Sequence, residues 1–325
     1  MTNKNSWYRW ILFVIVLTAV IWFIVHNLDE IARYNFQIEW LYLTFSFAFV
    51  NGAYLVMVMI WIRLSQSFGL NVSMLKAAKA WLLSQLGKYV PGKVTLLLVR
   101  FDAYSDYPKR KIAVATGIEY IASLASAGLL ILVALASAWQ LVPYYIQWVA
   151  GIGTILFLFL LWPPLSMKLF NRGLRLLKKE QIEEFPPYGV LLRFVGAYSL
   201  AGLLHGMGLF LVLNSFSSVS FAYFLIIAGS YEAAGLIGLA AVFAPSGIGV
   251  REGILFLVLP AFIPKPSVIV SVIAIRLLNT IAEVFLTGVF IGAEKYWQSH
   301  TGRKCSDMLR QVPDTGKSGI SMNKE

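Results

Sequence analysis

The stretch APSGIGVREG, residues 244–253, interrupts a strongly apolar part of the chain. Its proline cannot continue a helix, and its glycines permit backbone conformations that other residues avoid. A second interruption, LGKYVPGKV at 86–94, combines glycine, proline and charge in the same way. In hydrocarbon, irregular backbone is tolerated only inside protein or beside a water-filled cavity. The two stretches therefore predict irregular segments inside a membrane-embedded helical bundle.

The composition of the chain indicates a membrane protein. Of 325 residues, 58% are apolar and 13% are charged, and the mean hydropathy is +0.72. Apolar runs of about 20 residues match the thickness of a bilayer. The fold class that we expect is all-α, a polytopic integral membrane protein with two Pro/Gly-broken or re-entrant segments. Long spans are predicted at 9–26, 40–62, 112–138, 143–165, 190–213, 219–243 and 267–292, with a shorter apolar piece at 253–263 and an amphipathic piece at 74–86.

The basic residues, which give a formal net charge of +11, are distributed unevenly between the loops. They gather before the first span, between the second and third, after the fourth and after the last, whereas the loops at 27–39, 139–142 and 214–218 hold only Arg33. This alternation follows the positive-inside rule and predicts that both termini are cytoplasmic, which requires an even number of crossings. We therefore expect about eight crossings, with 253–263 as the short one. Basic residues placed in this way do not indicate nucleic acid as a partner.

Motifs for soluble chemistry are not found in the sequence. There is no phosphate loop or dinucleotide fingerprint, the lone Cys305 excludes an internal disulfide, and no His, Cys or carboxylate cluster has metal-ligand spacing. We expect no cofactor, no metal and no catalytic residue. The first apolar run is followed by VHNLDEIAR rather than a small-residue cleavage site, which predicts a retained helix. Residues 1–292 are expected to form a single transmembrane domain, and 293–325 a disordered basic cytoplasmic tail.

Charged residues inside the predicted spans are the second notable feature. Arg276, Asn279 and Glu283 are spaced i, i+3 and i+7, so they share one face of the last span. Glu232 and Glu119 lie within two other spans. An intramembrane charge costs at least about 2.5–3.5 kcal/mol, so these side chains should face the bundle interior. They are either ion pairs that fasten helices together or a polar route through the membrane, and the sequence leaves both open.

The two breaks favour a transporter-like site. Restarting helices present free N–H groups that favour anions, and a pair of Gly/Pro-interrupted segments in corresponding halves often marks a transporter's binding site. The alternative is that each break is an ordinary interfacial loop with snorkelling lysines. An internal inverted repeat also stays open, in which the segments 40–62, 86–94 and 112–138 correspond to 219–243, 244–253 and 267–292.

Four stretches, QLGKYVPGKV, GIEYIAS, APSGIGVREGIL and IRLLNTIAE, resemble the lysylphosphatidylglycerol synthase transmembrane family. This family includes the flippase half of the bacterial multiple peptide resistance factor, and the resemblance covers about 10–292. Its Gly-Lys-Tyr-x-Pro-Gly motif maps onto Gly87, Lys88, Tyr89, Pro91 and Gly92, and its Pro/Gly/Glu motif onto Pro245, Gly247, Gly249 and Glu252. Glu119 matches the family's acidic residue in the third long helix and Arg276 its late-helix arginine, while Tyr120 stands where an arginine is common. The resemblance implies a lipid translocase fold without the synthase domain.

These observations lead to one functional expectation with two alternatives. We expect a flippase-like translocase, not an enzyme, that moves a membrane lipid or polyprenyl-linked headgroup across the cytoplasmic (inner) membrane. The alternatives are a non-catalytic partner of a separately encoded synthase and a transferase that acts on a polyprenyl phosphate; a homo-oligomer or an associated synthase also stays open. The residues expected to bind substrate are Lys88, Tyr89, Pro91, Gly92, Lys93, Arg100, Glu119, Pro245, Gly247, Gly249, Arg251, Glu252, Arg276 and Glu283.

Overall fold

The computed structural model describes residues 38–87, 95–140, 142–241 and 244–310, together with short pieces between 18 and 34. Within these residues every regular element is a helix, which confirms the all-α prediction. In chain order the elements are α2 (Leu28–Arg33), α3 (Trp40–Ser67), α4 (Met74–Leu86), α5 (Thr95–Ala103), α6 (Lys109–Ser137), α7 (Tyr144–Leu160), α8 (Pro163–Leu176), α9 (Tyr188–Phe216), η2 (Phe221–Tyr223), α10 (Phe224–Ala240), η3 (Pro245–Gly247), α11 (Val250–Val258), η4 (Leu259–Ala261) and α12 (Lys265–Arg310).

Long apolar helices make this a multi-pass membrane protein. Five helical segments in the described residues are long and apolar enough to cross a bilayer: α3, α6, α9, Phe221–Ala240 and Lys265–Trp297. The helices α7 and α8 are long and apolar enough to cross a bilayer only when they are taken together, and the chain bends by 77° at the break between them. The predicted span 9–26 lies mostly outside the described residues. The expected count of eight crossings is therefore not confirmed.

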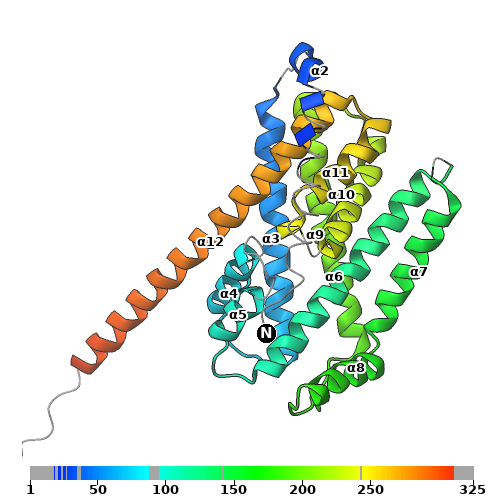
Figure 1. Ribbon diagram of the computed structural model, residues 1–325. Coiled ribbons are helices and arrows are strands. Elements are labelled where there is room, and N and C mark those ends of the chain that lie inside the picture. The colour runs from blue at the N-terminus through cyan, green and yellow to red at the C-terminus, as the bar shows by residue number, and fades with distance from the viewer. Residues whose placement is uncertain are drawn as a thin grey trace, which may run out of the picture.

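The helices α4 and α5 form a hairpin that does not cross the bundle. They contain 13 and 9 residues, which at 1.5 Å per residue makes each shorter than the hydrocarbon core. The two helices pack against each other, and the hydroxyl of Tyr107 donates to the carbonyl of Asn71 at 2.6 Å, which brings the two ends of the hairpin together. Figure 1 shows this hairpin beside the lower half of α3, with α6 starting near its open end.

A second hairpin consists of α10 and α11. The chain reverses through η3, where Ser246, Gly247 and Gly249 have φ values of 54°, 68° and 86°. The rings of Tyr223, before α10, and Phe262, after α11, lie 5.7 Å apart, so this hairpin also begins and ends at one end of the bundle. The predicted break at 244–253 is confirmed. The short crossing at 253–263 stays a prediction; the turn sends α11 back along α10.

The two hairpins enter the bundle from opposite ends. The helices α3 and α9 pack along each other, and the amide of Glu39 donates to the carbonyl of Ser215 at 3.0 Å, so these two spans are antiparallel. The first hairpin follows α3 and precedes α6, whereas the second follows α9 and precedes α12. The segment that occupies the position equivalent to α3 is therefore α9, and not the predicted 219–243, which supplies the first arm of the second hairpin.

Small residues let α10 pack closely against its neighbours. A Cβ at Gly206 of α9 would lie 2.4 Å from the Cβ of Ala228, and one at Gly229 would lie 2.2 Å from the Cβ of Ala134 on α6. Such contacts bring helix backbones together where lipid gives no hydrophobic driving force. The close packing fixes α10 between α6 and α9 and so determines where its polar side chains point.

The last helix extends beyond the boundary that we expected for the transmembrane domain. Helix α12 continues without a break past residue 292 to Arg310, and Figure 1 shows its final turns projecting away from the bundle. Near the boundary, Glu294 forms an ion pair with Lys79 of α4. The part of the predicted tail up to Arg310 is thus helical, and residues 311–325 lie outside the described part of the chain.

Candidate functional site

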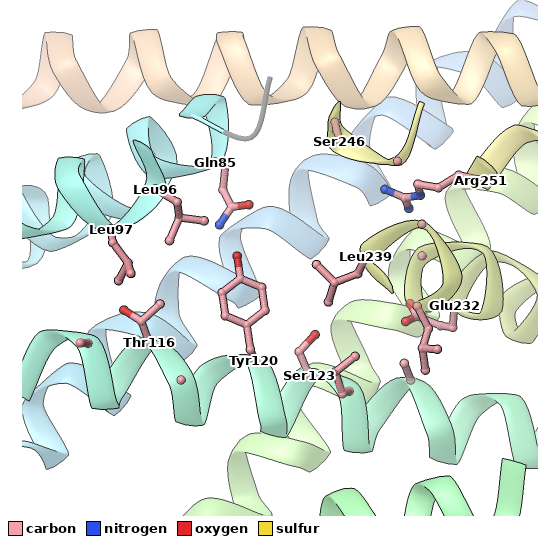
Figure 2. Close-up of a pocket in the computed structure, with 18 residues that line it drawn as sticks. Gln85, Leu96, Leu97, Thr116, Tyr120, Ser123, Glu232, Leu239, Ser246 and Arg251 are labelled. Atoms are coloured by element: carbon pink, nitrogen blue, oxygen red, sulfur yellow. The ribbon is translucent and has the colours of Figure 1, made fainter. Parts of the chain in front are cut away.

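A cavity of about 510 Å³ lies where the tips of the two hairpins meet α6. This volume falls within the range of roughly 300–1,000 Å³ that is typical of small-molecule sites. Figure 2 shows side chains from α4 and α5 on one side and from α10 and α11 on the other, with α6 between them. Its apolar walls include Leu96, Leu97, Leu124, Leu236 and Leu239, and its polar groups include Gln85, Thr116, Tyr120, Ser123, Glu232, Ser246 and Arg251. The cavity is therefore amphipathic.

Among the described residues that line this cavity, the basic side chain is Arg251, at the start of α11. Its guanidinium carbon lies 5.4 Å from the centre of the Tyr231 ring. Within the described residues, the guanidinium forms no ion pair and no hydrogen bond. Gly238 makes room for this side chain, because a Cβ there would lie 2.4 Å from Cγ of Arg251. The arginine is thus held at the cavity surface with its hydrogen-bond donors available.

The negative charge in the cavity comes from Glu232 of α10. A Cβ at Gly202 of α9 would lie 2.7 Å from its Oε1, so the carboxylate sits close to the backbone of α9. As for Arg251, the described part of the chain gives the Glu232 carboxylate neither an ion pair nor a hydrogen bond. Figure 2 shows both side chains on the same side of the cavity.

A second, smaller cavity of about 40 Å³ lies next to the first and also touches Arg251. Arg276 of α12 faces it, with Nε 3.3 Å from Oε1 of Glu252, and its guanidinium also donates to the carbonyl of Ser246 at 3.2 Å. The other carboxylate oxygen of Glu252 accepts from the amide of Gly249 at 2.7 Å. Glu252 and Arg276 therefore fasten the turn of the second hairpin to α12.

Glu283 lies on the other wall of the small cavity and is 1% exposed. It accepts a hydrogen bond from the hydroxyl of Tyr54 on α3 at 2.5 Å. The ring of His205 lies 5.2 Å from that of Tyr54 and stacks on Tyr231 at 5.7 Å. The structure thus brings the charged residues predicted from the second break and from the last span around one small polar cavity.

Arg100 and Glu119 form a separate, fully buried ion pair. Arg100 is 0% exposed, pairs with Glu119 and lies with its guanidinium carbon 3.9 Å from the centre of the Trp61 ring. The remaining donors of Arg100 reach Ser84 and Thr116, each at 3.1 Å. Glu119 accepts in addition from Trp81 at 2.7 Å and from Tyr198 at 3.3 Å. These two charges satisfy each other and do not line the larger cavity.

The predicted residues of the first break, Lys88, Tyr89, Pro91, Gly92 and Lys93, lie outside the described residues. The residues that flank this break do reach the cavity, because Gln85 in the last turn of α4 and Leu96 in the first turn of α5 line its wall. In the second break, Gly247 lines the cavity, while Pro245 and Gly249 belong to the turn that shapes it.

Sequence reasoning missed the uncharged groups of the site. Tyr54 and Tyr231 lie within apolar spans, where nothing in their spacing distinguishes them from aromatic residues that face lipid. Gln85 opens the quoted stretch QLGKYVPGKV, but it is not part of the Gly-Lys-Tyr-x-Pro-Gly motif and carries no charge. Glu232 was recognised as an intramembrane charge, and only the packing of α10 shows that it shares a cavity with Arg251. Within the described residues, no three His, Cys, Asp or Glu side chains gather closely enough to bind a metal ion.

The fold and the cavity together define a polytopic helical membrane protein with an amphipathic internal site. Comparisons with protein-family models and with curated proteins find no match for this chain.

Proposed function

We propose that this protein is a flippase-like translocase, or the transport component of one, for a lipid or lipid-linked headgroup that carries a phosphate. The observation that supports this most directly is Arg251, whose guanidinium faces an amphipathic cavity between two hairpins that enter from opposite ends of the bundle. A planar guanidinium suits a phosphate because it offers two parallel hydrogen bonds. The leucine-rich wall would hold the first part of an acyl or prenyl chain.

The resemblance to the lysylphosphatidylglycerol synthase transmembrane family supports the same proposal. One of the two motifs that carry it lies between α4 and α5 in the sequence, and the other lies at the turn between α10 and α11. We interpret α3 to α6 and α9 to α12 as inverted repeats. Transporters built in this way often place the substrate between discontinuous helices near the midplane. Movement of one hairpin against the other would expose the cavity to each leaflet in turn.

The proposal gives the remaining charged residues supporting roles. Arg276 and Glu252 hold the hairpin turn in place, so that Arg251 is presented to the cavity. Arg100 and Glu119 fasten the first hairpin to α6. We therefore assign Arg100 and Glu119 to the architecture of the site, and Arg251 to contact with substrate.

The orientation that we propose follows from the basic residues. Lys76 and Lys79 of α4 and the start of α6 lie at one end of the bundle, and the basic helix α8 lies at the same end in Figure 1. By the positive-inside rule this end faces the cytoplasm of a bacterial inner membrane. With the predicted first span at 9–26, we propose that both termini are cytoplasmic.

Reconstitution into vesicles tests the function. Purified protein is incorporated into liposomes that contain a trace of fluorescent phosphatidylglycerol, and lipid movement is measured by the fraction that dithionite cannot reach. We expect the wild type to accelerate movement and Arg251→Gln to abolish the acceleration, with Arg251→Lys in between. Arg172→Gln removes an exposed charge on α8 and serves as the matched control. Equal movement in wild-type and Arg251→Gln vesicles would refute the site, and movement no faster than in empty vesicles would refute the function.

A further inference from the structure

Glu232 presents a problem for any anionic headgroup that enters the cavity. The carboxylate shares the cavity with Arg251, so a phosphate bound to the arginine would lie near a second negative charge. In a low-dielectric site, two like charges at short range repel strongly. Among the described residues that line it, the cavity holds one positive and one negative charge, and a bound phosphate would make the sum of these charges negative.

The surroundings of Glu232 offer little to an ionised carboxylate. Its oxygen lies against Gly202 of α9, and no hydrogen bond reaches it from the described residues. An ionised group without partners is costly to bury, whereas a neutral carboxylic acid is not. Glu119 differs in this respect, because it accepts from several donors and pairs with Arg100.

The neighbouring helices bring few charged side chains to the cavity that could compensate the charge of an ionised Glu232. The other polar and titratable side chains that line this cavity among the described residues are Gln85 of α4, Thr116, Tyr120 and Ser123 of α6, Ser246 of η3 and Arg251 of α11. Tyr231 precedes Glu232 on α10, and His205 of α9 stacks on that tyrosine. Among the described residues that line the cavity, Arg251 is the one basic side chain. Once a phosphate occupies Arg251, that compensation is lost.

We propose that Glu232 is a proton-binding site, and that it takes up a proton when an anionic headgroup binds Arg251. The proton comes from the protonated buffer in solution, which becomes its conjugate base, and it forms the O–H bond of a neutral carboxylic acid, which removes the negative charge of Glu232. Binding of lipid and binding of proton are then thermodynamically coupled, and each strengthens the other by the same factor. The inference rests on the proposed translocase function and adds a proton that accompanies the phosphate.

The test is proton uptake during lipid binding in detergent solution. Short-chain phosphatidylglycerol is a suitable probe, because its phosphodiester does not titrate near neutral pH. Binding is measured by calorimetry in buffers of different ionisation enthalpy, over a series of pH values. We expect the wild type to take up as much as one proton per lipid, and its affinity to fall by about tenfold per pH unit once Glu232 is ionised in the free protein.

The variant Glu232→Gln mimics the neutral acid. We expect it to bind the same lipid with no proton uptake and with an affinity that does not depend on pH. Glu183→Gln, which alters an exposed carboxylate before α9, should keep the wild-type profile. Size-exclusion chromatography shows whether each variant is folded, and Arg251→Gln provides a second check because it should lose binding and uptake together.

Three results would overturn this inference. Wild-type binding without proton uptake at every pH refutes the inference and leaves the translocase proposal intact. Proton uptake that persists in Glu232→Gln assigns the proton to another group.

Short-chain phosphatidylcholine, with its permanent ammonium group, tests whether Glu232 instead receives a cationic headgroup. In that case Glu232→Gln weakens binding of phosphatidylcholine and leaves the pH profile for phosphatidylglycerol unchanged. If no lipid binds to the wild type, the proposed function fails together with the inference.

Discussion

Replacement of Glu119 by glutamine would show whether the ion pair with Arg100 supports the architecture or the transport site. Glutamine keeps the size of the side chain and one carbonyl oxygen, so Trp81 and Tyr198 can still donate to it. The guanidinium of Arg100, which is 0% exposed, would lose its counter-charge. Removing one partner of a buried pair costs about 3–5 kcal/mol, because the other charge is left uncompensated. We expect Glu119→Gln to lower the free energy of unfolding by this amount.

The double variant Arg100→Met/Glu119→Gln separates the charge from the packing. Because both ionised groups are gone, we expect it to recover most of the loss seen in Glu119→Gln. Unfolding is followed in mixed detergent micelles by titration with a denaturing detergent, and lipid movement is measured on the same preparations. Arg172→Gln on the surface of α8 should change stability by less than about 0.5 kcal/mol. If Glu119→Gln keeps wild-type stability while lipid movement stops, the pair belongs to the transport site and our assignment is wrong.

Three further predictions concern the second hairpin and the topology. Gly238→Ala should reduce lipid movement more than tenfold, because its Cβ would lie 2.4 Å from Cγ of Arg251, whereas Gly151→Ala on α7 meets nothing within 4 Å and should behave like wild type in the vesicle assay. Arg276→Lys removes the guanidinium nitrogen that donates to the Ser246 carbonyl, so we expect the free energy of unfolding to fall by about 1 kcal/mol in a thermal unfolding experiment. Its effect on transport should be smaller than that of Arg251→Lys. A reporter that is active only outside the cytoplasm should give no signal when fused to the C-terminus, and a strong signal there would refute the proposed orientation.

The sequence was sufficient to predict the membrane class and the location of the second break. Hydropathy depends on local composition, and a Pro/Gly-rich interruption forces irregular backbone whatever surrounds it. The number of crossings was harder to predict. An apolar segment such as 219–243 is long enough to cross, and only its contacts show that it forms one arm of a hairpin whose ends meet at Tyr223 and Phe262.

The sequence by itself also determined which charges lie at membrane depth, because each sits within an apolar run. Which charges pair with each other was decided by the tertiary structure. Arg100 and Glu119 were expected to bind substrate, yet α4, α5 and α6 pack so that the two charges meet each other. Arg251 and Glu232 stay unpaired within the described residues, because Gly238 and Gly202 give their side chains room at the cavity wall. A charge finds its partner through the approach of helices distant in sequence, and no local pattern of residues encodes that approach.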